Sequence, residues 1–556
     1  MRSLLLSGLI FTLVHLSPGQ DFNNEEYQKA LWMTTRMYGG QRSGNGPNWL
    51  IMDHGSGNDF VDDSDGSYDL SGGWHDCGDH VKFGQTQYYS AYMLLKAYAE
   101  WPTGFDDYYS FDYRGYHQAG DFSWASQQGT PNGIPDILDE VKYATNYFIK
   151  CARDDNTFYY QVGEGAKDHK QWVTSVKMAT LAPGEGGPPR TAFKNPNGSS
   201  MASFCGATLA LMARLYRKFD AAYSDECLEH ALHAYAYADV HHGAAGAADG
   251  SFYPANARWE DDFIVLLTEL YVTTGDDTYK NKAIDYAAHV RDHNWSLCYN
   301  NNDELAIYNL ALLNFSGKKN ALHQIAQRYK NNVTAEGVGK TGNQWGALRY
   351  SASQAYACAL NDKLHNSTSI DPFILNTIDY IMGSNNASQS FIVGFGATFP
   401  MHPHHRNVFL DDRNVSDAQK NNLQIPQRNI EFGFMVGGSL DPNSYVDDIN
   451  SYQYSEGGID YNAGLVGALG YIVSRLAPVD TSKFSGVSIV HDLRRDHILP
   501  GYTEHTFPFL PNNAQAVYLV NGRRIFGMVP PEKICAIPFV TTNNTTAKMR
   551  LPLDGK

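Results

Sequence analysis

The chain has few basic residues for its length. Lysine and arginine together number 43 against 59 aspartates and glutamates, so the formal net charge at pH 7 is −16 over 556 residues. Proteins that bind nucleic acid or an anionic membrane surface cluster basic side chains to neutralise phosphate charge. We therefore expect neither a nucleic acid nor a membrane as a partner, and a neutral or cationic partner fits better.

Long hydrophobic runs are also missing. The longest run, Leu4–Leu16, is shorter than the roughly 20 apolar residues that a membrane-spanning helix needs. It follows Met1-Arg2-Ser3 and precedes the small residues of Ser17-Pro18-Gly19, a pattern typical of a secretory signal peptide. We expect residues 1–19 to be removed and the rest of the chain to be secreted as a soluble extracellular protein.

Cysteine is scarce, which argues against a dense disulfide framework. The seven cysteines are an odd number, so at least one thiol should be free; they are Cys77, Cys151, Cys205, Cys227, Cys298, Cys358 and Cys535. Asn-x-Ser/Thr sequons are more frequent and predict a glycoprotein if the chain is exported from a eukaryotic cell. They begin at Asn197, Asn294, Asn314, Asn332, Asn366, Asn386, Asn414, Asn543 and Asn544.

The chain is rich in amphipathic helical pattern. Apolar residues recur at the spacing i, i+3, i+4 and i+7, as in Ile137, Val141, Ala144 and Phe148. This spacing predicts twelve helices, at residues 24–38, 86–101, 135–152, 202–218, 226–239, 261–274, 277–292, 304–315, 318–330, 350–361, 371–382 and 460–474. Twelve helices suggest six helical hairpins in one domain over residues 20–478.

Loops and a strand-rich tail complete the predicted organisation. Loops at 40–85, 103–133, 155–200 and 384–459 are long enough to carry function. After Pro478, β-branched and aromatic residues alternate with turn signals, and Val520-Asn521-Gly522-Arg523 predicts a hairpin turn. Residues 479–556 should therefore form a small strand-rich extension.

Two carboxylates, Asp76 and Asp79, lie between glycines and aromatics in the segment GGWHDCGDHVKFG, residues 72–84. Hydrolysis of a glycosidic bond needs one protonated carboxyl for the leaving oxygen and another carboxylate to activate water or attack the sugar. Asp76 and Asp79 could supply the second role, because close carboxylates also raise each other's proton affinity. A pair of turn or helix-capping aspartates would show the same spacing.

The segment 72–84 closely resembles the Gly-Gly-Trp/Tyr-Tyr-Asp-Ala-Gly-Asp-His-Val-Lys-Phe-Gly block of family 9 glycoside hydrolases, an endoglucanase family. Two further regions match in order: residues 379–406, with DYIMGSN, FIVGFG and PHHR, and residues 445–463, ending in SEGGIDYNA. The resemblance implies an all-α fold, an (α/α)6 barrel of six helical hairpins with long functional loops and a small β-rich C-terminal extension.

Catalytic roles follow from the same resemblance. Asp79 would be the general base that activates water, Asp76 would help to hold that water, and Glu456 would be the general acid. The family inverts anomeric configuration, so acid and base should lie about 6.5–9.5 Å apart. Partial desolvation of Glu456 would keep it protonated.

Substrate contacts are implied for His404, His405 and Arg406, whose donors can hold sugar hydroxyls. A metal site is the alternative for this run, but the sequence has no second ligand cluster at a defined spacing. Flat aromatics could stack on sugar rings, with core packing as the alternative for each; the candidates are Trp74, Trp172, Phe252, Tyr253, Trp295, Trp345 and Tyr461.

No cofactor is required for this chemistry. Family members often carry structural calcium on a loop ending in two acidic residues, and Asp261 and Asp262 fall at that place. An acidic helix N-terminus favoured by the helix dipole would explain the same residues.

The chain departs from the family pattern at the catalytic segments. Cys77 stands where alanine is usual, Ser455 replaces asparagine, and Gly457 and Gly458 replace valine and alanine. The two glycines would loosen the setting of Glu456, because glycine adds backbone freedom.

The first hypothesis of function is a secreted, monomeric, inverting endo-β-1,4-glucanase acting on cellulose or a related β-glucan. The second is an exo-acting cello- or chito-oligosaccharide hydrolase of the same fold. The third is a non-catalytic glycan-binding protein, which would keep the aromatics and lose Asp79 or Glu456. Both carboxylates are present.

Overall fold

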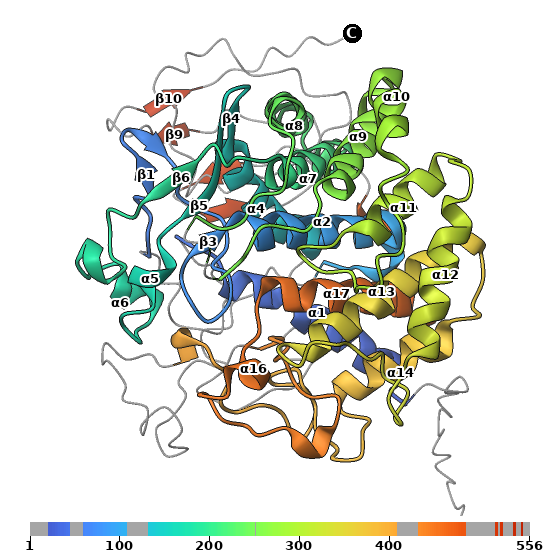
Figure 1. Ribbon diagram of the computed structural model, residues 1–556. Coiled ribbons are helices and arrows are strands. Elements are labelled where there is room, and N and C mark those ends of the chain that lie inside the picture. The colour runs from blue at the N-terminus through green and yellow to red at the C-terminus, as the bar shows by residue number, and fades with distance from the viewer. Residues whose placement is uncertain are drawn as a thin grey trace, which may run out of the picture. The chain divides into compact units, whose positions relative to one another are not determined.

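The computed structural model describes residues 21–44, 59–107, 132–248, 250, 252–408 and 432–484, and four short strands after residue 517. Contacts divide the chain into two units, Met1–Ser485 and Gly486–Lys556. The first unit contains the helices, drawn from blue to orange in Figure 1. None of the helices described is long and apolar enough to cross a membrane.

Six inner helices form a closed ring in which each contacts the next. In order they are α2 (Gly84–Glu100), α7 (Ser200–Tyr216), α9 (Glu260–Thr274), α11 (Asp303–Leu312), α13 (Ala347–His365) and α17 (Ile459–Leu476), and α17 contacts α2 again. Small residues allow this close approach: a Cβ on Gly464 of α17 would lie 2.6 Å from Ser353 of α13. Because each inner helix is surrounded by others, most of its residues are buried.

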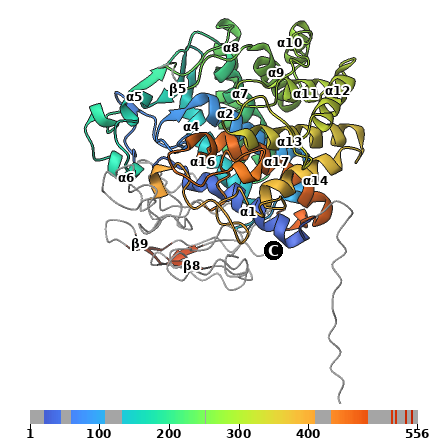
Figure 2. The same ribbon diagram turned by 60° about the horizontal axis from the view of Figure 1, so that its bottom comes forward.

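Within the described part of the chain, six outer helices cover the ring. They are α1 (Asn24–Gly40), α4 (Asp136–Cys151), α8 (Ala221–Val240), α10 (Asp277–Tyr286), α12 (Lys318–Asn331) and α14 (Asp371–Met382). The outer helix α8 packs on α7, α10 on α9, α12 on α11 and α13, α14 on α13, α1 on α17, and α4 on α2. Figure 2 shows α13 and α17 near the middle of the view, with α8, α10 and α12 at its edge. The (α/α)6 prediction is confirmed, and each predicted helix overlaps one of these twelve.

A small antiparallel sheet lies beside the barrel. Strand β5 (Thr157–Val162) pairs with β3 (Lys82–Phe83), β4 (Ala152–Asp154) and β6 (Ala192–Lys194), and β1 (Ser64–Asp65) pairs separately with β2 (Tyr68–Asp69). The register places Lys82 opposite Val162 and Phe83 opposite Gln161. The sheet therefore fixes the end of the segment 72–84 just before α2 begins.

Short helices occur in the loops. The α-helical turns are α5 (Gly165–Asp168), α6 (Ser175–Met178) and α16 (Tyr452–Ser455). The 3-10 turns span Pro102–Gly104, Pro183–Glu185, Arg406–Val408, Pro442–Ser444 and Thr481–Phe484. These turns shape the long loops that the sequence predicted to carry function.

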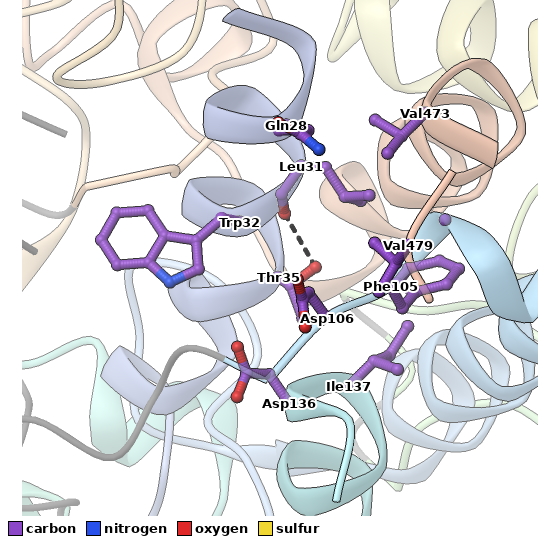
Figure 3. Close-up of a pocket in the computed structure, with 11 residues that line it drawn as sticks. Gln28, Leu31, Trp32, Thr35, Phe105, Asp106, Asp136, Ile137, Val473 and Val479 are labelled. Carbon is purple, nitrogen blue, oxygen red and sulfur yellow. Dashed lines mark hydrogen bonds between the residues drawn. The ribbon is translucent and has the colours of Figure 1, made fainter. Parts of the chain in front are cut away.

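The chain after α17 closes the barrel at the C-terminal ends of α2 and α17. Val479 donates its N–H to the carbonyl of Thr103 at 2.7 Å, and Lys483 forms an ion pair with Asp106. Val479 lies with Phe105, Val473 and Ile137 around a cavity of about 30 Å³ (Figure 3). Residues 479–484, predicted to begin the extension, are thus part of the first unit, and the unit boundary falls at Ser485.

The described residues of the second unit form two short hairpins. Strand β7 (Tyr518–Val520) pairs antiparallel with β8 (Arg523–Ile525), and β9 (Pro538–Val540) pairs with β10 (Thr546–Lys548). Val520 lies opposite Arg523, as the predicted turn between them requires. The extent of the predicted strand-rich extension stays a prediction, since these strands are the part of the second unit that the structure describes.

Candidate active site

A cleft of about 940 Å³ opens at the N-terminal ends of the inner helices. Its walls come from the loops that precede α2, α9, α11, α13 and α17, together with the loop 169–172 and residues 404 and 406. The lining residues are Asp76, Cys77, Asp79, His169, Lys170, Gln171, Trp172, Phe252, Tyr253, Tyr299, Asn343, Trp345, Arg349, Tyr350, His404, Arg406, Tyr452, Glu456 and Tyr461. All three proposed catalytic carboxylates are among them.

Asp76 and Asp79 lie in a tight loop ahead of β3. The Asp76 N–H donates to the carbonyl of Val81 at 3.1 Å, and the Val81 N–H donates to Asp79 Oδ1 at 2.9 Å. Gly78 lets the loop pass the neighbouring chain, because a Cβ there would lie 2.2 Å from the carbonyl oxygen of His404. The Asp-x-x-Asp pattern thus forms a turn that holds both carboxylates at the cleft.

The two aspartates differ in their surroundings. Asp76 accepts hydrogen bonds from the hydroxyls of Tyr253, at 2.5 Å, and Thr86. Burial raises its pKa well above the usual range, and the Asp79 carboxylate raises it further. Burial, followed by the negative charge of Asp168, also raises the pKa of Asp79, and the neighbouring Arg406 opposes this shift. Asp79 thus has a cationic neighbour that favours its ionised form.

A buried ion cluster supports this loop from below. Asp63 pairs with Lys82 at 2.8 Å and accepts from Arg190 Nε at 2.9 Å. Burial opposes ionisation of Asp63, but the two cations lower its pKa to about 2. Lys82 also donates to the carbonyl of Gly72 at 3.0 Å, and Arg190 donates to that of His80 at 2.6 Å. The cluster fixes both ends of the catalytic loop.

Glu456 lies between α16 and α17. Its backbone N–H donates to the Tyr452 carbonyl at 3.0 Å, and its carbonyl accepts from the Gly437 N–H at 2.6 Å. The indole Nε1 of Trp345 donates to Glu456 Oε2 at 3.2 Å. Burial, followed by the negative charge of Asp79, raises the pKa of Glu456 to about 8. A pKa of about 8 favours the protonated form of Glu456 at neutral pH, and Asp79 lies in the same cleft.

Arg349 forms the floor of the cleft beside Glu456. Its Nη1 donates to Asp460 Oδ2 at 2.8 Å. The guanidinium lies 4.5 Å from the ring centre of Tyr461 and 4.7 Å from that of Tyr350. Tyr461, predicted as a sugar contact, is thus in the cleft but has its ring against a cation.

The run 404–406 places its three side chains in different environments. His404 lines the cleft, and its ring lies 4.8 Å from that of Trp172. His405 is fully buried and contacts Gln41 at 3.0 Å, so it cannot touch a substrate in this arrangement. Arg406 lines the cleft and pairs with the buried Asp168. The two histidines do not converge on one point, as a metal site would require.

The predicted aromatic contacts fall into two groups. Phe252, Tyr253 and Trp345 line the cleft, and Phe252 and Trp345 expose 39% and 43% of their surface. The prediction for Trp74 is wrong: it is fully buried and donates its indole N–H to Glu140 at 3.1 Å. Trp295 does not line the cleft, and its ring packs edge-on against Tyr350.

Sequence reasoning missed several cleft residues. Tyr299, Tyr350 and Tyr452 line it, as does His169, whose ring stacks on Phe252 at 4.6 Å. Their positions in the sequence could have indicated a place in the cleft. Tyr350 begins a predicted helix, and Tyr299 and Tyr452 lie in the loops that lead into one.

Asp261 and Asp262, predicted to bind calcium, lie in a hydrogen-bonded cluster. Asn302 donates its N–H to Asp261 at 2.8 Å and its amide to Asp262 at 2.9 Å. Arg258 pairs with the adjacent Asp303 at 2.7 Å, so a cation is already present. Of these side-chain oxygens only Asp261 Oδ1 and Asn302 Oδ1 lack a partner, whereas calcium takes about six to eight oxygen ligands. Calcium is therefore not shown at this cluster, and the described residues contain no group of three metal-binding side chains.

The cysteines and sequons lie as follows. The six cysteines within the described residues are all buried and free, and Cys535 lies outside those residues. The six described sequon asparagines, Asn197, Asn294, Asn314, Asn332, Asn366 and Asn386, are all exposed.

Comparison with known proteins gives consistent matches. The sequence matches the family described as "Glycosyl hydrolase family 9" over residues 27–469. It is 34% identical to Endoglucanase A of Fibrobacter succinogenes over 438 residues, covering 74% of this chain and 93% of that protein. An endoglucanase from the termite Nasutitermes takasagoensis aligns with a TM-score of 0.67 at 28% identity, covering 81% of this chain and 99% of that one. The cellulase Cel9M of C. cellulolyticum aligns equally well, with a TM-score of 0.67 at 29% identity over 80% of this chain and 98% of that one.

Proposed function

The chain belongs to glycosyl hydrolase family 9, and on that premise we propose that it is an exported endo-β-1,4-glucanase with Glu456 as general acid and Asp79 as general base. The observation that carries this proposal is a single cleft that holds Glu456, whose pKa is raised to about 8, together with the aspartate pair Asp76 and Asp79. Burial raises the pKa of Glu456 to about 8, and the positive charge of the neighbouring Arg406 favours the ionised form of Asp79. Hydrolysis of a glycosidic bond needs this combination.

In the proposed reaction a β-1,4-glucan lies along the cleft with its sugar faces against Trp345 and Phe252. Glu456 gives its proton to the leaving glycosidic oxygen. Asp79 removes a proton from a water molecule that attacks the anomeric carbon from the opposite side, which inverts its configuration. Asp76, fixed by the hydroxyls of Tyr253 and Thr86, holds that water in place.

Arg349 and Arg406 would hold the substrate and the catalytic groups. Arg349 is paired with Asp460 and Arg406 with Asp168, so each guanidinium is fixed before substrate arrives. Pre-organised donors of this kind lose little entropy when they hydrogen-bond a sugar hydroxyl.

Two measurements on the wild-type protein test this proposal. An endo-acting enzyme should lower the viscosity of carboxymethylcellulose before much reducing sugar appears, whereas the exo-acting alternative would release sugar with little change in viscosity. Proton NMR of cellopentaose hydrolysis should show the α-anomer first if the enzyme inverts. A β-anomer as first product would contradict the roles given to Asp79 and Glu456.

Export and glycosylation are part of the same proposal. The support is the signal-like pattern of residues 1–19 together with the exposure of every described sequon asparagine. Expression in a eukaryotic secretory host should give a monomer in the medium that begins at Gln20 and loses mass on treatment with a peptide N-glycosidase. A protein that stays inside the cell and still carries residues 1–19 would contradict the proposal.

A further inference from the structure

The proposed base and acid segments meet directly through the backbone. The N–H of Ile459, at the start of α17, donates to the carbonyl of Asp76 at 3.0 Å. Cys77 and Gly458 flank this hydrogen bond and face each other across the junction. A change in their contact therefore acts at the junction between the segment of Asp76 and the segment of Glu456.

Position 458 favours glycine because a side chain there has no room, and not because of its backbone conformation. Gly458 has φ −173° and ψ 177°, an extended conformation that any residue adopts. A Cβ on Gly458, however, would lie 2.5 Å from Cys77 Sγ. Non-bonded heavy atoms pack best about 3.5–4.0 Å apart, so a side chain at 458 must displace the sulfur by roughly 1 Å.

The neighbouring glycine is constrained differently. A Cβ on Gly457 would lie 2.2 Å from the backbone oxygen of Met435, so no change of side chain elsewhere could make room for it. At Gly458 the nearest obstacle is a side chain that can be replaced, and the next atom, the backbone oxygen of Asp76, would lie 3.2 Å from the added Cβ. The expectation that both glycines loosen the acid's setting does not hold at these contacts, because each lies where its chain is tightly packed.

Cys77 is well placed to transmit a displacement to the catalytic groups. It is 4% exposed, and its sulfur lies 3.7 Å from the hydroxyl of Tyr253. The same hydroxyl donates to Asp76 at 2.5 Å. Burial and the charge of Asp76 raise the pKa of the thiol well above its usual value, so it acts as a packing group and not as a nucleophile.

We propose that Cys77 and Gly458 are a matched pair of positioning residues, in which the sulfur occupies the space of a side chain at 458 and so sets the spacing between the base and acid segments. The catalytic part of this inference rests on the proposed function, whereas the packing part does not. Alanine at both positions would supply the same number of side-chain heavy atoms as cysteine and glycine. The two departures from the family pattern are then one compensated change.

A double-mutant cycle on the full chain tests the pair. The variants are Cys77→Ala, Gly458→Ala and the double variant, with kcat and KM measured on cellopentaose and unfolding measured in urea. Gly458→Ala alone should lower kcat on the order of 100-fold, because a displacement near 1 Å at a catalytic group costs about that much. The KM should change little, since the cleft walls are untouched. The double variant should recover at least about tenfold of the lost kcat, the sign of a coupled pair.

Two controls separate this coupling from general effects. Gly184→Ala adds a methyl group where nothing lies within 4 Å, and it should leave kcat and unfolding unchanged. Cys205→Ala removes another buried free thiol, on α7, and should not rescue Gly458→Ala.

The unfolding midpoints distinguish failure of this inference from failure of the proposed function. If the protein cleaves no glucan, the double variant should still unfold at higher urea than Gly458→Ala. If Gly458→Ala does not fold, the double variant should fold and the Cys205→Ala/Gly458→Ala variant should not. The proposal would be overturned if Gly458→Ala kept the kcat and the urea midpoint of the wild type. It would also be overturned if the double variant had a kcat and a midpoint no higher than those of Gly458→Ala.

Discussion

Removing the indole donor next to Glu456 should move the alkaline limit of activity to higher pH. Trp345 Nε1 donates to Glu456 Oε2 at 3.2 Å, which stabilises the ionised form and lowers the pKa that burial has raised to about 8. In Trp345→Phe this donor is lost, so the ionised form becomes less favourable and Glu456 keeps its proton longer. A general acid that stays protonated extends activity upward in pH.

The size of the shift follows from the exposure of the bond. A hydrogen bond to a charged group contributes about 1.5–3 kcal/mol when buried. Trp345 is 43% exposed, and solvent screening should reduce this by half or more. The remaining ~0.7–1.4 kcal/mol corresponds to about half to one pKa unit.

The assay is kcat/KM on cellopentaose between pH 4 and pH 10, because this ratio reports the free enzyme. Trp345→Phe should also lower the rate through lost sugar contact, but the position of the alkaline limb does not depend on that loss. Trp295→Phe is the matched control, since this indole is 39% exposed and does not line the cleft. An alkaline limb that stays in place or moves to lower pH in Trp345→Phe would refute the reasoning.

Three further predictions concern stability. Asp63→Asn leaves the buried cations Arg190 and Lys82 without their carboxylate, so the free energy of unfolding measured in urea should fall by about 3–5 kcal/mol. A fall below about 1 kcal/mol would mean that the cluster does not support the loop. Glu456→Gln should stabilise the protein at pH 9 but not at pH 4. A carboxyl with its folded pKa raised from 4.5 to about 8 costs stability progressively as pH rises between those values, and an equal effect at both pH values would contradict this. Removal of divalent metal with EDTA should leave the melting temperature unchanged, because Arg258 already supplies a cation to the acidic cluster; a fall that calcium alone reverses would show that a calcium site exists.

The architecture could be predicted because it depends on regular repetition. Twelve amphipathic segments predict six helical hairpins around a common core, and the resemblance to a known family implied that these hairpins close into a barrel. The sequence pattern did not separate inner from outer helices by itself. That distinction depends on which residues another helix covers, as at Gly464 against Ser353.

The three carboxylates could be located from sequence because each lies in a long motif of unusual residues. The direction in which a side chain points could not be predicted from the sequence. Trp74 lies two residues before Asp76, yet it turns into the core because Glu140, 66 residues later, accepts its indole N–H. His405 is buried although its chain neighbours His404 and Arg406 line the cleft. The reason is similar, because its ring contacts the distant Gln41. Such partners come from other helices and leave no local sequence signal.

The most direct test of the acid and base assignments is the activity of Glu456→Gln and Asp79→Asn on two substrates. Cellopentaose needs a proton on its leaving oxygen, whereas 2,4-dinitrophenyl β-cellobioside has a leaving group stable as an anion. Glu456→Gln should lose about 10²–10⁴-fold on cellopentaose and keep most of its activity on the aryl glycoside, while Asp79→Asn should lose activity on both. Equal losses of Glu456→Gln on both substrates, or an Asp79→Asn variant that still cleaves the aryl glycoside, would contradict the assigned roles.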